Sequence, residues 1–145
     1  MNREELGIRK ALEARRMSYA PYSKFYVGAY LETAEGEGYQ GCNIENAAYG
    51  PSNCAERTAF FKAVSDGKRD FTRITIVGGY EEDSLEYCPP CGVCLQVMRE
   101  FCNPDNFEIL VAKNEKDYQI YTLKELLPQG FGPEIIVMEE ERRRL

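Results

Sequence analysis

The chain opens with a segment whose apolar residues recur at the spacing of one helix face. Ile8, Ala11 and Leu12 lie on one side of a helix drawn through this segment, and charged residues fill most of the intervening positions. Asn2 precedes them as a candidate N-cap, and Glu5 follows it three residues later, as in a capping box. We therefore expect a first helix here.

Further along, five segments have the pattern of β-strands. They are rich in β-branched and aromatic residues, and residues that favour turns bound them. They cover about Tyr26–Thr33, Gly38–Asn43, Thr72–Val77, Phe107–Lys113 and Tyr118–Thr122. The first two are separated by alternating glutamate and glycine, which predicts a hairpin.

Helical segments alternate with the later strands. Residues Cys54–Asp66 are rich in helix formers and end before Gly67, and Cys91–Cys102 predicts a further helix. Thr122 with Glu125 three residues later is the capping-box signature of a short last helix. This order of elements predicts an α/β fold, a three-layer α/β/α sandwich around a five-stranded mixed sheet.

Length and charge narrow the class of protein. The 145 residues fit one compact domain, residues 1–145, without an internal repeat or a linker. The net charge of −6 argues against a nucleic acid polymer as partner, because phosphates call for a basic surface. It favours a neutral small molecule. The one dense basic run, Arg142–Arg144, follows three glutamates and is interpreted as a solvated tail.

The cysteines are interpreted against the expected compartment. The first 17 residues are charged throughout, so we expect no signal peptide, no membrane partner and a cytoplasmic location. In a reducing compartment, six cysteines predict metal ligands, catalytic groups or core residues rather than disulfides. The chain has no histidine, so a zinc site would have to use thiolates and carboxylates.

Three cysteines have the spacing of a metal site. Cys91 and Cys94 lie three apart on one face of a predicted helix, where both sulfurs can reach one ion at about 2.3 Å. Cys54 begins another predicted helix. Helix N-termini present free N–H groups and the positive end of the helix dipole, and both favour thiolate over thiol. Three ligands with a fourth position open are typical of a catalytic zinc ion, whereas structural zinc has four.

A carboxylate stands next to the first of these cysteines. Glu56, two residues after Cys54, can receive a proton from a zinc-bound water without coordinating the metal. The pattern CAE at residues 54–56, followed by PCGVC at residues 90–94, matches the zinc-deaminase signature in an all-cysteine form. The motifs therefore predict a hydrolytic zinc enzyme.

Four separated blocks extend the pattern beyond the zinc motifs. They are YAPYSKF at 19–25, GCNIENA at 41–47, CAERTA at 54–59, and ELLP at 125–128 with FGP at 131–133. With these blocks the chain resembles the short, homotetrameric cytidine deaminases of nucleoside salvage, from about residue 18 to residue 135. The resemblance implies a cytidine deaminase-like fold, a homotetramer, one Zn²⁺ per subunit and a small nucleoside substrate. The implied reaction converts cytidine or deoxycytidine to uridine or deoxyuridine plus ammonia.

The resemblance also implies roles in catalysis. The zinc ligands would be Cys54, Cys91 and Cys94. Glu56 would take a proton from zinc-bound water and pass it to N3 of cytosine, the hydroxide would attack C4, and Glu56 would protonate the departing amino group. Arg57 would hydrogen-bond the thiolates and offset the net −1 charge of a three-thiolate zinc centre. The backbone N–H of Ala55 would contact the substrate.

Five further side chains would bind the nucleoside. The resemblance places Asn43 and Glu45 on the ribose 3′-hydroxyl, and Phe25 against the pyrimidine ring. Phe131 and Tyr49 would reach the active site from neighbouring subunits. Taken singly, each of these residues is as easily a core aromatic, a turn residue or a surface charge; only the blocks together favour the functional interpretation.

Some positions depart from the family pattern or leave a choice. Pro89 stands where serine is usual, and Leu95 stands where arginine is common, which would alter a contact near the site or between subunits. Cys88 also forms a CxxC pair with Cys91, but the two prolines between them lack N–H donors, so we favour Cys91 with Cys94.

Rival functions stay open at this point. A thioredoxin-like redox protein would use the CxxC cysteines as an exchanging pair. A non-catalytic structural-zinc module would use Cys88 as a fourth ligand. A related zinc aminohydrolase would act on another amino-pyrimidine nucleoside. Cys42 and Cys102 are expected to pack as small apolar side chains.

Overall fold

The computed structural model describes residues 1–82 and 84–136, so the basic run Arg142–Arg144 lies outside the described residues. One mixed sheet has the strand order β2-β1-β3-β4-β5, with β3 parallel to β4 and the other neighbours antiparallel. The strands are β1 (Tyr26–Thr33), β2 (Gly38–Cys42), β3 (Phe71–Gly79), β4 (Glu108–Ala112) and β5 (Tyr118–Thr122). The predicted five-stranded mixed sheet is confirmed.

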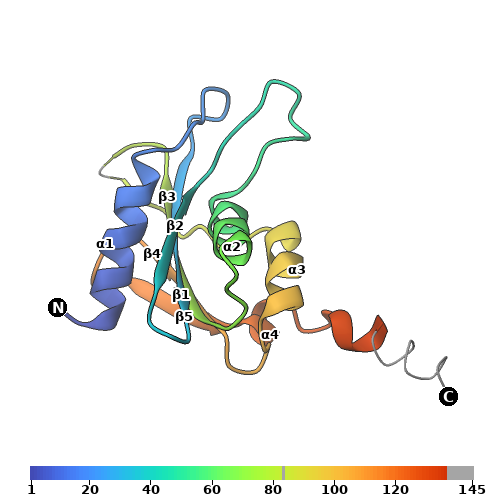
Figure 1. The fold of residues 1–145 in the computed structure, drawn as a ribbon. Helices are drawn as coiled ribbons and strands as arrows, with labels where there is room; N and C mark the ends of the chain where they lie inside the picture. The colour runs from blue at the N-terminus through green and yellow to red at the C-terminus, as the bar shows by residue number, and fades with distance from the viewer. Residues whose placement is uncertain (83, 137–145) are drawn as a thin grey trace, which may run out of the picture.

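Helices cover both faces of this sheet (Figure 1). One face carries α1 (Arg3–Arg15), and the other carries α2 (Ala55–Ser65), α3 (Gly92–Phe101) and the short α4 (Leu123–Leu126). Successive side chains of β3 pack on opposite faces: Ile76 belongs to the core on the α2 and α3 side, and Val77 to the core under α1. The three-layer α/β/α architecture is therefore confirmed.

Some of these helices begin with a side-chain cap, and others begin without one. Asn2 caps α1, because its Oδ1 accepts the Glu5 N–H at 2.8 Å. Thr122 and Glu125 form the predicted capping box of α4. In contrast, α2 and α3 begin at Cys54 and Cys91, whose side chains make no cap hydrogen bond. The two helices that begin without a side-chain cap are the two whose ends carry thiols.

The ends of β3 and β2 differ from the predicted strand ends. β3 extends to Gly79 because that residue pairs with Tyr26 of β1, although glycine has low strand propensity. β2 stops one residue early, at Cys42. Beyond it, Asn43 bonds to Val27 through both backbone and side chain: its N–H donates to the Val27 carbonyl at 3.3 Å, and its Oδ1 accepts the Val27 N–H at 2.9 Å.

Two anchors fix α1 on the sheet. The side chain of Arg15, 8% exposed, donates to the backbone carbonyls of residues 26, 79, 81 and 82. At Gly28 the helix approaches the sheet so closely that a Cβ atom would lie 2.0 Å from the Ala11 carbonyl oxygen and 2.6 Å from the Arg15 nitrogen. Within residues 1–82 and 84–136, no helix combines the length and the apolarity needed to cross a membrane.

Replacing Gly28 by alanine tests this close approach. The added methyl group has no room against helix backbone, so we expect Gly28→Ala to lower the free energy of unfolding by about 3 kcal/mol. Urea denaturation followed by circular dichroism measures this change. The matched control is Gly50→Ala, whose Cβ would meet nothing nearer than 4.0 Å. Equal midpoints for the two variants would contradict the account of α1 packing.

Candidate metal centre and active site

Three thiols converge where α2 and α3 begin. Cys54 precedes α2, Cys91 precedes α3, and Cys94 lies in the first turn of α3. The Cys54 and Cys91 sulfurs are 3.8 Å apart, and the Cys91 and Cys94 sulfurs are 3.6 Å apart. A tetrahedral ion with sulfur ligands at about 2.3 Å would separate them by about 3.8 Å. The three donors therefore fit zinc, and within the described ranges they form the one such cluster of cysteine and acidic side chains.

Charge around this cluster favours thiolates. Arg57, in the first turn of α2, donates from Nη2 to the Cys54 sulfur at 3.4 Å. The hydrogen bond from the Cys94 thiol and the Arg57 guanidinium hold the pKa of Cys54 below its usual range. In this pair the pKa of Cys94 is raised, because that thiol keeps the proton that it shares with Cys54. A metal ion would displace this proton, since only thiolates ligate zinc.

Beside the thiols lies one buried carboxyl group. Glu56 is 4% exposed although it lies in the first turn of α2. Burial raises its pKa to about 7. A carboxyl group with such a pKa can accept and release a proton at neutral pH.

A pocket of about 420 Å³ opens onto this cluster. Its lining contains most of the residues expected in the site, namely Phe25, Asn43, Glu45, Cys54, Ala55, Glu56, Arg57 and Cys91. They come from the loop before β1, the segment after β2 and the starts of two helices. A concave site with a few convergent polar groups is the usual form of a small-molecule site.

Hydrogen bonds fix the polar side chains of this pocket. The Asn43 amide joins two backbone positions at the start of β1 in the same chain. Its Nδ2 donates to the Phe25 carbonyl at 2.8 Å, and its Oδ1 accepts the Val27 N–H. The Glu45 carboxylate accepts the N–H groups of Tyr22 and Ser23, each at 3.1 Å, and the Ser23 hydroxyl. The Ser23 hydroxyl, followed by these N–H groups, lowers the pKa of Glu45.

Two of the expected substrate-binding residues do not lie in this pocket. Tyr49 is 73% exposed and Phe131 is 56% exposed. Tyr49 touches Tyr22 edge to face, with ring centroids 6.2 Å apart. The Phe131 carbonyl accepts a hydrogen bond from Gln96 of α3 at 3.1 Å. A single chain therefore does not bring these two rings to the pocket.

The departures from the family pattern have distinct locations. Leu95 is 7% exposed and belongs to the core between the sheet and α2 and α3, so it fills apolar space instead of reaching the pocket. Pro89 and Cys88 line the pocket. Cys88 packs beside Gly78 and Phe25, outside the thiol cluster, and burial raises its pKa to about 12. The predicted preference for Cys91 with Cys94 agrees with this cluster, which does not include Cys88.

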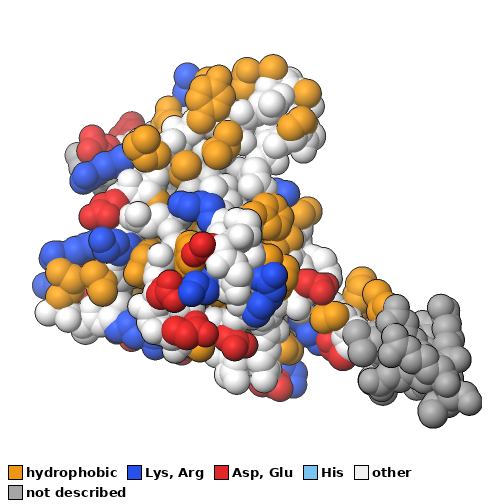
Figure 2. Space-filling model, viewed as in Figure 1, with side chains coloured by type: hydrophobic (Ala, Val, Ile, Leu, Met, Phe, Trp, Pro, Cys, Tyr) orange, Lys and Arg blue, Asp and Glu red, His pale blue; other side chains and the backbone are white. Residues whose placement is uncertain are grey.

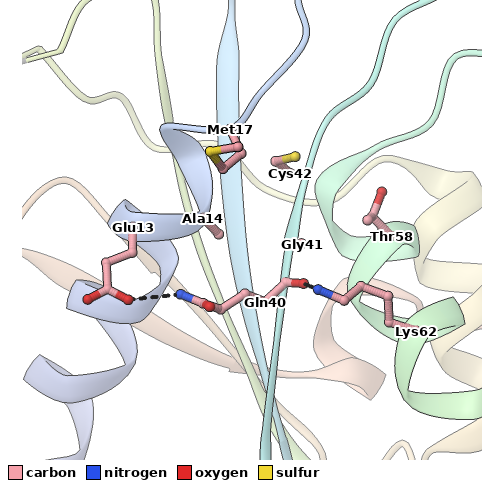
Figure 3. A pocket seen from close by; sticks show the side chains of 8 residues that line it. All are labelled: Glu13, Ala14, Met17, Gln40, Gly41, Cys42, Thr58 and Lys62. Atoms are coloured by element: carbon pink, nitrogen blue, oxygen red, sulfur yellow. Dashed lines mark hydrogen bonds between the residues drawn. The ribbon is translucent and has the colours of Figure 1, made fainter. Parts of the chain in front are cut away.

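The two remaining cysteines lie apart from the site. Cys102 is buried in the core, as expected. Cys42 is half-buried and lines a second pocket, about 230 Å³, between α1, β2 and α2 (Figure 3). In this pocket Lys62 donates to the backbone carbonyl of Gln40 at 2.6 Å, and the Gln40 side chain donates to Glu13 at 3.0 Å.

Two residues near the pocket were not singled out from the sequence. Ser23 holds Glu45, and the only available signal was its place in the block at 19–25. Tyr80 packs edge to face on Phe25, with ring centroids 4.8 Å apart. No local pattern could have joined residues 55 positions apart in the chain, because their contact depends on the pairing of β1 with β3.

Zinc content distinguishes the thiol cluster from the rival CxxC pair. We expect about one zinc ion per wild-type chain. Cys54→Ser, Cys91→Ser and Cys94→Ser should each weaken zinc binding by more than about 100-fold, since each removes a ligand. Cys88→Ser, the matched control, should keep its zinc. Metal analysis after dialysis against a chelator measures this, and zinc loss in Cys88→Ser alone would contradict the assignment.

Comparisons with known proteins agree with this geometry. Residues 1–108 match the family described as the cytidine and deoxycytidylate deaminase zinc-binding region. The cytidine deaminase of Halalkalibacterium halodurans is 46% identical over 134 residues, which cover 92% of this chain and 97% of that protein. The cytidine deaminase of Sporosarcina psychrophila is also 46% identical, over 127 residues that cover 88% and 90%.

A solved structure shares the fold. The crystal structure of cytidine deaminase from Burkholderia pseudomallei superposes with a TM-score of 0.80 at 41% identity, covering 90% of this chain and all of that one. The family match spans the thiol cluster and Glu56. The sequence match, the shared fold and the zinc-compatible thiols agree, and the chain belongs to the cytidine and deoxycytidylate deaminase zinc-binding family.

Proposed function

We propose that the protein catalyses the hydrolytic deamination of cytidine, deoxycytidine or both, releasing uridine or deoxyuridine and ammonia in pyrimidine salvage. One observation carries the proposal: the pocket that holds the buried carboxyl group of Glu56 together with Asn43, Glu45 and Phe25 opens onto the cluster of three zinc-compatible thiols. The activity of the relatives in sequence and structure supports it.

The two carboxyl groups of the pocket lining suit different roles. The pKa of Glu56 is raised to about 7 by burial, whereas that of Glu45 is lowered by the Ser23 hydroxyl and by N–H groups. When the pKa values of two carboxyl groups differ in this way, the one with the raised pKa suits proton transfer and the one with the lowered pKa suits binding. Glu56 is thus the proton shuttle, to N3 of the ring and then to the leaving amino group. Glu45 stays ionised and accepts hydrogen bonds from the substrate.

The thiols and Arg57 prepare the site for its metal ion. Zinc held by Cys54, Cys91 and Cys94 supplies Lewis acidity that lowers the pKa of a coordinated water. Three thiolates leave such a centre with a net charge of −1, which would weaken that acidity. Arg57, already in contact with the Cys54 sulfur, offsets the excess negative charge.

Substrate binding follows from the remaining lining. Phe25 offers an aromatic face to the pyrimidine. Ala55 is the first residue of α2, so its N–H has no partner within the helix and is free to donate to the ring. Asn43 and Glu45, two apart after β2, would hold the ribose 3′-hydroxyl.

Assembly as a homotetramer belongs to the same proposal. Hydrophobic side chains gather on the two loops that project beyond the sheet (Figure 2), where Tyr19, Tyr22, Ile44 and Tyr49 are exposed. Exposed apolar patches on proteins commonly mark contacts with partners. Tyr49 and Phe131, outside the pocket of their own chain, would complete the pocket of a neighbour. A cytoplasmic location is supported by the six cysteines, all of them free thiols.

The Glu56→Gln variant tests the shuttle directly. It keeps the shape of the side chain but cannot transfer the proton, so we expect kcat to fall by about 10² to 10⁴-fold with zinc retained. The loss of cytidine ultraviolet absorbance measures this. Glu45→Gln, the matched control in the same pocket, should chiefly raise KM. A zinc-loaded wild type that turns over neither cytidine nor deoxycytidine would overturn the proposed function, and a panel of other amino-pyrimidine nucleosides would then identify the substrate.

Mixed tetramers test the contribution of neighbouring chains. Light scattering should give four times the chain mass of 16.6 kDa. We expect Phe131→Ala to lower kcat/KM about tenfold or more, in line with the loss of a stacking contact. Co-expression of Phe131→Ala with Glu56→Gln should restore part of the activity, because some sites then combine an intact Glu56 with an intact Phe131. Activity no higher than that of the separate variants would place Phe131 within its own chain.

A further inference from the structure

The hydroxyl group of Ser23 joins two side chains of the pocket. It donates to the Glu45 carboxylate and accepts the Phe25 N–H at 3.0 Å. A hydroxyl group has one hydrogen to donate. The ionised carboxylate can only accept and the N–H can only donate, so both contacts fix the orientation of this hydroxyl.

Asn43 closes the connection on the other side of Phe25. The Phe25 carbonyl accepts a hydrogen bond from the Asn43 amide at 2.8 Å. The backbone of the ring-bearing residue is therefore held at both ends by polar side chains. The intervening Lys24 has a φ of 59°. Such a left-handed conformation costs a non-glycine residue on the order of 1–3 kcal/mol and persists where its surroundings enforce it.

We propose that Ser23 is a positioning residue for nucleoside recognition: it aims the Glu45 carboxylate at the ribose and fixes Phe25 at the matching distance for the base. The inference rests on the proposed function and assigns one shared support to two binding contacts. Ser23 lies in the pocket lining with Glu45 and Phe25, and its hydroxyl bonds to these two residues and not to a member of the thiol cluster. Its effect therefore falls on binding more than on the proton transfers.

The hydrogen-bonding capacity that Glu45 and Asn43 keep after their contacts within the protein defines the substrate group that they can bind. Glu45 can only accept, and Asn43 keeps one N–H beyond the one donated to Phe25. A hydroxyl group both donates and accepts, so it satisfies the two side chains at once. A substrate without the 3′-hydroxyl makes neither of these hydrogen bonds, so the remaining N–H of Asn43 and the free acceptor sites of Glu45 gain no partner from it. Ser23 thus contributes to selectivity for the 3′-hydroxyl.

The test compares deoxycytidine with 2′,3′-dideoxycytidine as substrates of zinc-loaded enzyme. For Ser23→Ala we expect KM for deoxycytidine to rise about tenfold, in line with a lost hydrogen bond to a charged group, and kcat to change less. The ratio of kcat/KM between the two substrates should fall by a similar factor. Ser23→Thr should restore the ratio, because it keeps the hydroxyl and the side chain is exposed. Ser23→Cys, a weaker donor of similar size, gives the same readout if the alanine variant does not accumulate.

Controls separate positioning from a structural role. Ser65→Ala removes an exposed hydroxyl that donates to the Lys62 backbone carbonyl at 2.9 Å at the end of α2, and it should leave the ratio unchanged. In the Glu45→Gln background, Ser23→Ala should lose most of its effect on the ratio. A full effect in that background, or an unchanged ratio in active Ser23→Ala, would overturn the positioning role. Absence of deoxycytidine turnover by the wild type would instead overturn the proposed function.

Discussion

Three sulfur atoms that repel one another as thiolates must be held within hydrogen-bonding distance, and the site depends on this constraint. Two helix starts meet the requirement, since each presents N–H groups and the positive end of a dipole. The starts can meet only if α2 lies very close to β2. Gly41 permits this, because a Cβ there would lie 2.4 Å from the Ala55 carbonyl oxygen and 2.5 Å from the Ala59 nitrogen. On the buried side, Phe60 packs against Phe71 and Phe107 and keeps the helix there.

The same seating of α2 separates the environments of the two carboxyl groups. Glu56, two residues after Cys54, is buried because it lies in the first turn of α2, where the helix faces the core. Glu45 lies on an extended segment at the rim, where N–H groups of the loop before β1 surround it. Burial on one side and hydrogen-bond donors on the other thus give two chemically identical groups opposite pKa shifts.

Sequence patterns predicted an element well where the interactions that fix it join residues close together in the chain. The caps at Asn2 and Thr122 were readable because a cap and its partner lie three residues apart. The thiol cluster was predictable for a similar reason, since Cys54 begins one helix and Cys91 and Cys94 lie three residues apart at the start of another. Pairing between strands was harder to predict from the sequence. The extension of β3 to Gly79, for example, depends on pairing with β1.

The hydrogen bonds that hold the pocket side chains in place could not be predicted from the sequence. The Ser23 hydroxyl contacts Glu45 and the Phe25 N–H next to Lys24, whose left-handed conformation a lysine in the sequence does not predict. The roles of Asn43 and Phe25 could be named only by resemblance. Their mutual hydrogen bond, which makes them one unit, belongs to the tertiary structure. The place of Leu95 in the core also required the packed fold, because an arginine and a leucine are equally compatible with the helix pattern.

The hydrogen bond from Lys62 to the Gln40 carbonyl has a consequence for solubility. β2 is the edge strand beside β1, and edge strands with free backbone groups recruit strands of other chains. Here an ammonium group covers an outward-facing acceptor in the middle of β2, and the Gln40 side chain is tied back to α1. The charge and the occupied acceptor therefore oppose growth of the sheet into fibrils from this edge.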